Sequence, residues 1–198
     1  MTNKYFDLEE APEIRQPVAI LSGALIEKFF DIHCEKIESI KALTGRLPNE
    51  GEIYFLWTIN SFNAFTFIPF LIRESGIITE LIISTYSINK RIIDALVKLV
   101  DQEKILQVHI LISDSVKTLL SGVNDHLVAI VENKKQITVR YAWNHSKIAL
   151  IRTGDNHFIV EGSGNWGENA RHEHYEFLNT KTVYEFRKNE ILTAGLDS

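Results

Sequence analysis

The apolar positions of this chain recur with two different spacings, one typical of strands and the other of helices. Short runs rich in β-branched and aromatic residues predict strands over 53–57, 80–84, 105–112, 127–131, 137–141 and 174–178. Apolar residues three or four apart predict helices over 22–43, 62–73, 89–100 and 182–192, and a short helix that Asp114 or Ser115 caps and that continues to Leu120. Pro69 is expected to kink or interrupt the second helix, and Gly76 to close it.

Strands and helices alternate through the middle of the chain. This alternation predicts an α/β fold with a mixed, largely parallel sheet flanked by helices on both faces. At 198 residues and 45% hydrophobic content, the chain can bury one core, so we expect a single domain over residues 1–198. Residues 1–20 hold Pro12 and Pro17 and little periodicity, and they predict an irregular arm.

Composition limits the cellular location and the partners that we expect for this protein. The first 16 residues lack the apolar stretch of a signal peptide, and no apolar run is long enough to predict a membrane span. The single cysteine, Cys34, excludes an internal disulfide and fits a reducing cytosol, so we expect a cytoplasmic protein. A net charge of −5 argues mildly against a protein that coats nucleic acid.

The candidate chemistry lies in a predicted hairpin. Two short apolar runs, 148–151 and 158–160, flank the turn cluster at 153–156. His145 and Lys147 are two residues apart, so on a strand they point to the same side. The return strand brings Gly162-Ser163-Gly164-Asn165 to the same end of the hairpin. An imidazole, an ammonium, a hydroxyl and a carboxamide at one place suit a phosphate group.

These residues resemble the signature of the phospholipase D superfamily, H-x-K followed by a hairpin and G-S-x-N. The resemblance adds a glutamate further on, which here is Glu173. It departs from the family at Arg152, where an aspartate is usual, although Asp155 can stand in for that aspartate on a longer turn. The chain as a whole looks like the short, single-motif members found in bacteria and their phages.

The resemblance implies a phosphodiesterase that needs no cofactor and no metal. His145 would attack phosphorus and form a phosphohistidine, while Lys147 and Asn165 hold the non-bridging oxygens. Ser163 would hydrogen-bond nearby, and Glu173 would orient His145. Because one chain carries one H-x-K unit and the family uses two histidines, we expect a homodimer that shares the active-site cleft.

For the substrate we favour nucleic acid, which makes the chain an endonuclease on DNA or RNA. The stretch 133–152 holds five basic and no acidic residues and leads into the proposed site. Beyond the catalytic group, we expect substrate contacts from Gly162, Gly164, Arg140 and Arg152. Two alternatives stay open: a hydrolase or transferase for phospholipid headgroups, and a nucleic-acid-binding module of the same fold without turnover.

Other histidines give weaker signals. His172, His174 and Glu176 alternate on one predicted strand, where we expect an exposed polar face rather than a metal clip. His33 stands beside Cys34 in the first predicted helix, where adjacent residues diverge, so we expect packing or surface roles for both.

Overall fold

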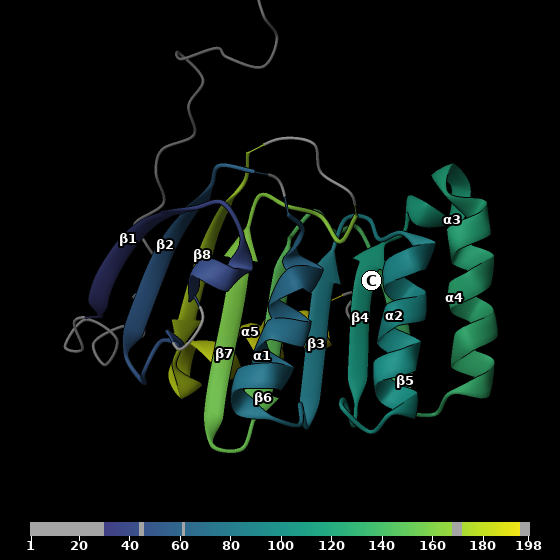
Figure 1. The fold of residues 1–198 in the computed structure, drawn as a ribbon. Coiled ribbons are helices and arrows are strands. Elements are labelled where there is room, and N and C mark those ends of the chain that lie inside the picture. The colour runs from purple at the N-terminus through teal and green to yellow at the C-terminus, as the bar shows by residue number, and fades with distance from the viewer. Residues whose placement is uncertain (1–29, 44–45, 61, 168–171, 195–198) are drawn as a thin grey trace, which may run out of the picture.

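An eight-stranded sheet runs through the part of the chain that the computed structural model describes, residues 30–43, 46–60, 62–167 and 172–194 (Figure 1). Its strands are β1 (Asp31–Ile37), β2 (Glu52–Thr58), β3 (Glu80–Thr85), β4 (Val108–Ser113), β5 (Ile137–Ala142), β6 (Ile148–Thr153), β7 (Asn156–Gly162) and β8 (His174–Asn179). The helices are α1 (Phe67–Ser75), α2 (Lys90–Asp101), α3 (Val116–Leu119), α4 (Ser121–Asn133) and α5 (Lys181–Thr193). Two 3₁₀ turns, η2 (Ile40–Leu43) and η3 (Ala64–Thr66), complete it. The irregular arm expected over 1–20 lies outside the described residues.

The sheet is mixed, with the strand order β1-β2-β8-β7-β6-β3-β4-β5. β6 and β8 run against the other strands, which all point the same way. The sheet is mixed, as expected, but it is not largely parallel, because three of its neighbouring strand pairs are parallel and four are antiparallel. Parallel neighbours are confined to the two sides, β1-β2 and β3-β4-β5, because the hairpin partner β6 and the strand β8 separate them.

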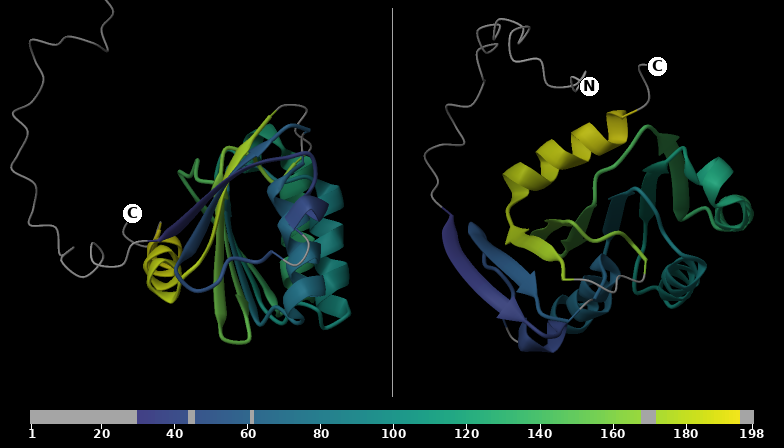
Figure 2. Two further views of the ribbon diagram at one scale, coloured as in Figure 1. Left: turned by 60° about the vertical axis from the view of Figure 1, so that its left-hand side comes forward. Right: turned by 90° about the horizontal axis from the view of Figure 1, so that it is seen from above.

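Helices cover both faces of this sheet, as the alternation predicted. Seen edge-on, α5 lies on one side and α1, α2 and α4 lie on the other (Figure 2). Strand β6 shows how each face is buried: Ala149 and Ile151 join the larger core cluster, while Leu150 joins the cluster under α5. A strand buried on both faces is apolar at successive positions, which is why β6 appears in the sequence as a continuous run.

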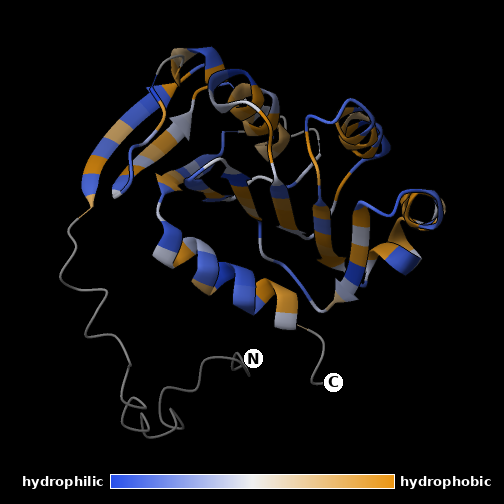
Figure 3. Ribbon diagram, turned by 90° about the horizontal axis from the view of Figure 1, so that it is seen from below, coloured by the Kyte–Doolittle hydropathy of each residue, from blue (hydrophilic) through white to orange (hydrophobic). Residues whose placement is uncertain are grey.

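Helix α2 begins and packs as its sequence pattern predicts. The side chain of Asn89 accepts a hydrogen bond from the amide of Ile92 at 2.9 Å and so caps the first turn. Its buried residues are all apolar, and its ribbon carries both hydrophobic and hydrophilic stretches (Figure 3). The helix therefore holds the loop that precedes it, residues 86–89, at the carboxyl end of β3.

The predicted hairpin is formed by β6 and β7. Its ladder runs from Ile148 opposite Glu161 to Thr153 opposite Asn156, which leaves a two-residue loop. Gly154 takes the first loop position with φ +54°, a conformation that glycine adopts without strain.

The first predicted helix, 22–43, is wrong where the chain is described: residues 31–37 form strand β1 and 40–43 form η2. Side chains of β1 alternate, with His33, Glu35 and Ile37 turned inward and their neighbours exposed. This period of two was hidden by apolar residues that also fit a helical spacing. Pairing with β2 decided between the two.

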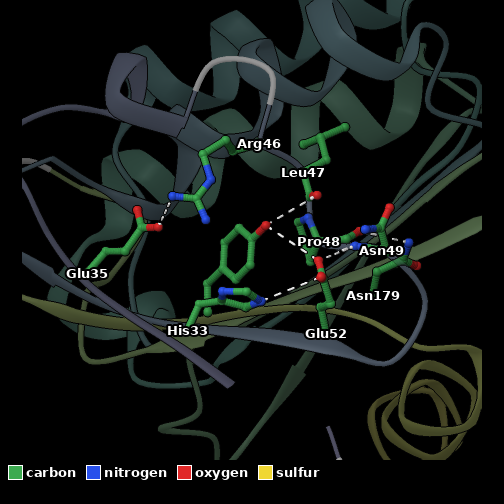
Figure 4. A network of polar contacts seen from close by, with 9 residues as sticks. His33, Glu35, Arg46, Leu47, Pro48, Asn49, Glu52 and Asn179 are labelled. Atoms are coloured by element: carbon green, nitrogen blue, oxygen red, sulfur yellow. Dashed lines mark hydrogen bonds and ion pairs between the residues drawn. The ribbon is translucent and has the colours of Figure 1, made fainter. Parts of the chain in front are cut away.

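A polar network around Tyr54 holds these outer strands (Figure 4). The ring of His33 packs edge-on against Tyr54, with centroids 4.8 Å apart, and its Nε2 lies 3.5 Å from Glu52 Oε1. Arg46 pairs with Glu35, and the Asn179 amide donates to the carbonyl of Pro48 at 3.1 Å. The network thus joins β1 and β2 to the end of β8.

Two further expectations need correction. Residues 127–131 belong to α4 rather than to a strand, because Val123, Leu127 and Ile130 recur at helical spacing and pack on the core. Pro69 does not break its helix, since it lies in the first turn of α1, where no backbone donor is needed. Gly76 ends α1 at φ +86°, as expected. Within the described ranges, no helix is long and apolar enough to cross a bilayer.

Candidate active site

The H-x-K pair lies between β5 and β6, beside the end of β7. The amide of Gly162 donates to the carbonyl of Lys147 at 3.2 Å, which extends the β6-β7 ladder by one step. The amide of Ser163 donates to the carbonyl of His174 at 3.2 Å and does the same for β7 and β8. Strand pairing therefore brings the histidine-lysine segment and the glycine-serine segment to one end of the sheet.

An open cleft of about 550 Å³ forms where these segments meet. Its lining residues are His145, Ser146, Lys147, Ile148, Glu161, Gly162, Ser163 and Arg187. The predicted histidine, lysine, serine and first glycine thus share one cavity, and the arrangement supplies two cations beside an imidazole.

His145 and Lys147 contact each other directly. Nζ of Lys147 lies 3.3 Å from Nδ1 of His145 and donates to its carbonyl oxygen at 2.9 Å. Burial lowers the pKa of Lys147, and the negative charge of Glu173 opposes part of that shift. His145 is an exposed residue, so solvent and substrate can reach it.

Glu173 reaches the cleft through Ser163. The hydroxyl of Ser163 donates to the Glu173 carboxylate and accepts from the amide of His174 at 3.2 Å. The backbone of Glu173 is pinned to fully buried Thr58, whose Oγ1 accepts from its amide at 2.8 Å. We expected Glu173 to orient His145, but within one subunit its carboxylate holds Ser163 and acts on the charge of Lys147.

Asn144 fixes the backbone on both sides of His145. Its Nδ2 donates to Ser84 Oγ at 3.1 Å and to the carbonyl of Thr85 at 3.2 Å. Its Oδ1 accepts from the amide of Ser146 at 3.0 Å and from the hydroxyl of Ser146 at 2.8 Å. The segment is therefore tied to the end of β3, and His145 projects from a braced turn.

Asn165 follows on the same loop, half-buried between buried Gly164 and fully buried Trp166. Trp166 docks on the loop before α2: its amide donates to the carbonyl of Ser87, and its carbonyl accepts from the amide of Asn89. Residue 86 of that loop, a tyrosine, lies against His145 with ring centroids 4.9 Å apart. The loop of Asn165 is therefore joined through Trp166 to the loop that carries Tyr86.

The chain is similar to known proteins in its fold. No protein-family model and no curated protein sequence match the chain. The structure is similar to that of Nuc, a phospholipase D family member from Salmonella typhimurium, with a TM-score of 0.52 and 17% identity over 72% of this chain and 93% of that one. It also resembles part of polyphosphate kinase from Porphyromonas gingivalis, with a TM-score of 0.54 and 14% identity over 77% of this chain and 28% of that one.

The fold is phospholipase D-like. The structure also shows where Arg152 lies, the residue that stands at the usual aspartate position of the family. Arg152 lies five residues beyond Lys147 along β6, about 17 Å away at the usual rise of a strand. Its Nε donates to Thr79 Oγ1 at 3.1 Å. Asp155 is in the exposed turn at the end of the hairpin far from the cleft.

Arg140, the other arginine that we expected to contact substrate, also lies away from the residues that line the cleft. Arg140 donates to the carbonyls of Leu192 and Ile191 at 2.7 and 2.6 Å, and so satisfies the last turn of α5. Lys134 pairs with Asp101 on the helical side of the fold. The basic stretch 133–152 therefore does not form one surface, because its side chains alternate between faces and ends of the sheet.

Sequence reasoning missed Arg187 and Glu161. Arg187 projects from α5 into the cleft, and its Nε and Nη2 donate to the two carboxylate oxygens of Glu161 at 2.6 and 2.9 Å. Nothing in a lone arginine of an amphipathic helix marks it as a site residue. The alternation of β7 indicates only that Glu161 shares a face with Ile159, toward α5.

The histidines near β8 do not form a metal site. Nδ1 of His172 donates to the carbonyl of Thr58 at 2.8 Å, its ring stacks on Trp57, and His174 is exposed. In the described ranges, no group of three or more His, Cys, Asp or Glu side chains is placed to hold a metal ion.

Proposed function

We propose that this chain is a phosphodiesterase that acts on nucleic acid through a covalent phosphohistidine, as a homodimer. The observation that supports it is the contact of His145 with Lys147 in a cleft that also holds Ser163 and Arg187. A nucleophile with two cations and a hydroxyl around one cavity matches the charge and geometry of a phosphodiester.

Binding of the phosphate prepares the nucleophile. The ammonium of Lys147 is a donor only, so its contact with Nδ1 leaves the ring proton on Nε2 in the free protein. A phosphate oxygen in the cleft draws Lys147 away, and the proton can then move through solvent to Nδ1. Nε2 becomes the attacking nitrogen.

The reaction then takes two steps. Nε2 of His145 forms a bond to phosphorus, the bond from phosphorus to the leaving oxygen breaks, and an acid protonates that oxygen. Water next attacks phosphorus, the phosphorus–nitrogen bond breaks, and the conjugate base takes the proton of the water. The partner subunit's His145 serves as this acid and base, because the described part of one chain offers one H-x-K pair.

Lys147 and Arg187 balance the charge of the phosphate, and the Arg187–Glu161 ion pair limits the net positive charge. Few basic residues face the cleft, so binding would depend only moderately on salt, with a slope set by about two phosphate contacts. Fixed donors around the phosphate supply the charge stabilisation, so the proposed reaction needs no added metal.

A cleavage panel tests the proposal. Labelled DNA, RNA and phospholipid vesicles are incubated in EDTA with the purified protein, with His145→Ala and with the control His126→Ala. The ring of His126, on α4, pairs with Asp94 of α2, away from the cleft lining. We expect cleavage of nucleic acid, a loss of about 10³-fold or more in His145→Ala, and no change in the control. Label trapped on His145 would identify the intermediate.

Other outcomes are equally informative. Cleavage of vesicles alone would indicate a phospholipid hydrolase, and binding of nucleic acid without any turnover would indicate an inactive binding module. Full activity in a protein that sedimentation shows to be a monomer would contradict the shared cleft.

A further inference from the structure

Strands β3, β4 and β5 are parallel neighbours in the sheet (Figure 1). A second cavity, of about 370 Å³, opens beside His145, among residues that end or directly follow these strands. It is lined by Tyr86, Ser113, Ser115, Trp143, Asn144 and His145. His145 also lines the first cleft, so the two cavities meet at the proposed nucleophile. The carboxyl ends of parallel strands are where α/β folds usually bind ligands, and the volume is in the range of small-molecule sites.

The walls of this cavity are aromatic. Trp143 is 94% exposed, and it has no ring partner among the described residues. Tyr86 packs at a tilt of 51° against the imidazole of His145. Two aromatic side chains thus flank the nucleophile, and one of them presents its faces to solvent, although large aromatic residues are usually well buried.

The polar groups of the cavity are poorly placed to distinguish one base from another, because most of them already have hydrogen-bond partners. The amide of Asn144 is occupied by the end of β3 and by Ser146. Ser113 and Ser115 hydrogen-bond each other at 2.8 Å, so each hydroxyl has a partner already. A ligand would be held mainly by ring stacking, which accepts every base because each has a π-face.

We propose that this cavity binds the nucleobase next to the scissile phosphate, stacked on Trp143 and Tyr86, and that the substrate is therefore single-stranded. The inference rests on the proposed function, and it adds the strandedness of the substrate. A base inside a duplex is stacked on both faces and paired along its Watson–Crick edge, so it reaches a cavity of this kind only after it has left the helix. An unpaired strand carries no such cost.

The test compares Trp143→Ala and Trp143→Phe with the unsubstituted protein. The substrates are a single-stranded oligonucleotide, the same strand with abasic sites flanking each linkage, and its duplex. The matched control is Phe55→Ala, an exposed aromatic on β2 that lines neither cavity.

We expect the single strand to be cut in preference to the duplex and to the abasic strand. Trp143→Ala should raise KM on the normal strand by about 5- to 100-fold, the effect of one stacked base, and leave KM on the abasic strand unchanged. Trp143→Phe should keep most of the affinity, and Phe55→Ala should behave as the unsubstituted protein.

The test distinguishes a failure of the proposed function from a failure of the base-binding inference. No cleavage of any nucleic acid would remove the proposed function itself. Cleavage in which Trp143→Ala and the abasic strand behave normally would overturn only the base-binding inference. Dissociation of a dimer by Trp143→Ala would also overturn it, because Trp143 would then be a contact between subunits.

Discussion

Nζ of Lys147 lies 3.3 Å from Nδ1 of His145, and both side chains face the cleft that Ser163 completes. Burial lowers the pKa of this lysine, and the charge of Glu173 restores part of it. If the ammonium must be charged to hold the phosphate, activity is present below that pKa and is lost as the pH rises through it.

We therefore expect kcat/KM to fall on the alkaline side, at a lower pH than an ordinary lysine near 10.4 would give. Lys147→Arg stays charged over the whole range, so its profile should lack this alkaline limb even if its neutral rate is lower. Rate profiles from about pH 6 to about pH 11 measure both. The same limb in Lys147→Arg would assign it to another group.

Asn144 is expected to position the nucleophile. Asn144→Ala removes the bonds from residue 144 to the end of β3 and to Ser146, although Ser146 keeps its own bond to Ser84, so kcat should fall about tenfold or more while KM changes little. Stability should fall by about 1–3 kcal/mol, since Ser84 and Ser146 lose partners. Asn133→Ala, which removes an exposed amide on α4 bonded only to the carbonyl of Ala129, is the control. Equal kcat in both variants would show that the network is not needed for catalysis.

Gly162 has a steric reason to be glycine. A Cβ at this position would lie 2.2 Å from the carbonyl oxygen of His174 and 2.8 Å from the Tyr175 ring. Gly162→Ala should therefore destabilise the fold by about 2 kcal/mol or more and shift β7 from β8. Gly167→Ala, where a Cβ meets open space, should cost little. Denaturant unfolding of the two variants makes the comparison, and equal stabilities would contradict the close approach.

Ser163 and Glu173 should act as one unit. Because the hydroxyl donates to the carboxylate, Ser163→Ala and Glu173→Ala each remove the same contact. In a double-mutant cycle on kcat/KM, we expect a coupling of about 0.5–3 kcal/mol. Strict additivity would mean that Glu173 serves the reaction by another route, such as its charge beside Lys147.

Glu80 ties α5 to the sheet and makes stability depend on pH. Burial opposes its charge, but hydrogen bonds from Lys188 and Tyr184, at 2.7 and 2.8 Å, prevail and lower its pKa. Its contribution is therefore complete above the ordinary carboxyl pKa near 4.5 and is lost as the pH falls through the lowered value.

Glu80→Gln should then cost about 1–3 kcal/mol of unfolding free energy at neutral pH, and the difference from the unsubstituted protein should shrink in acid. Chemical denaturation at about pH 7 and about pH 3 measures this difference. A difference that persists unchanged in acid would point to packing rather than charge.

The sequence predicted well wherever one periodicity had no competitor. The hairpin at Gly154 and the helix that starts at Asn89 formed as expected, because a turn glycine and helical apolar spacing act locally. Residues 31–37 and 127–131 failed because their apolar positions fit both periods. Pairing with β2 decided the first, and packing of Leu127 on the core decided the second.

The site was predicted in part for a similar reason. His145, Lys147 and Ser163 follow from strand register alone, since a hairpin returns to its own start. Arg187 enters from α5, whose rotation over the sheet no local pattern fixes. Arg140 and Arg152 were misplaced because a count of charges ignores the alternation of strand faces.

Trp166 is fully buried three residues after Ser163, and its backbone forms hydrogen bonds with the loop before α2. The segment from Ser163 to Trp166 is therefore anchored to the core, and we expect it to lose its structure only when the core does. On warming, catalysis and tertiary structure should vanish together, at one temperature, whereas a loop held only at the surface would let the chemistry fade first.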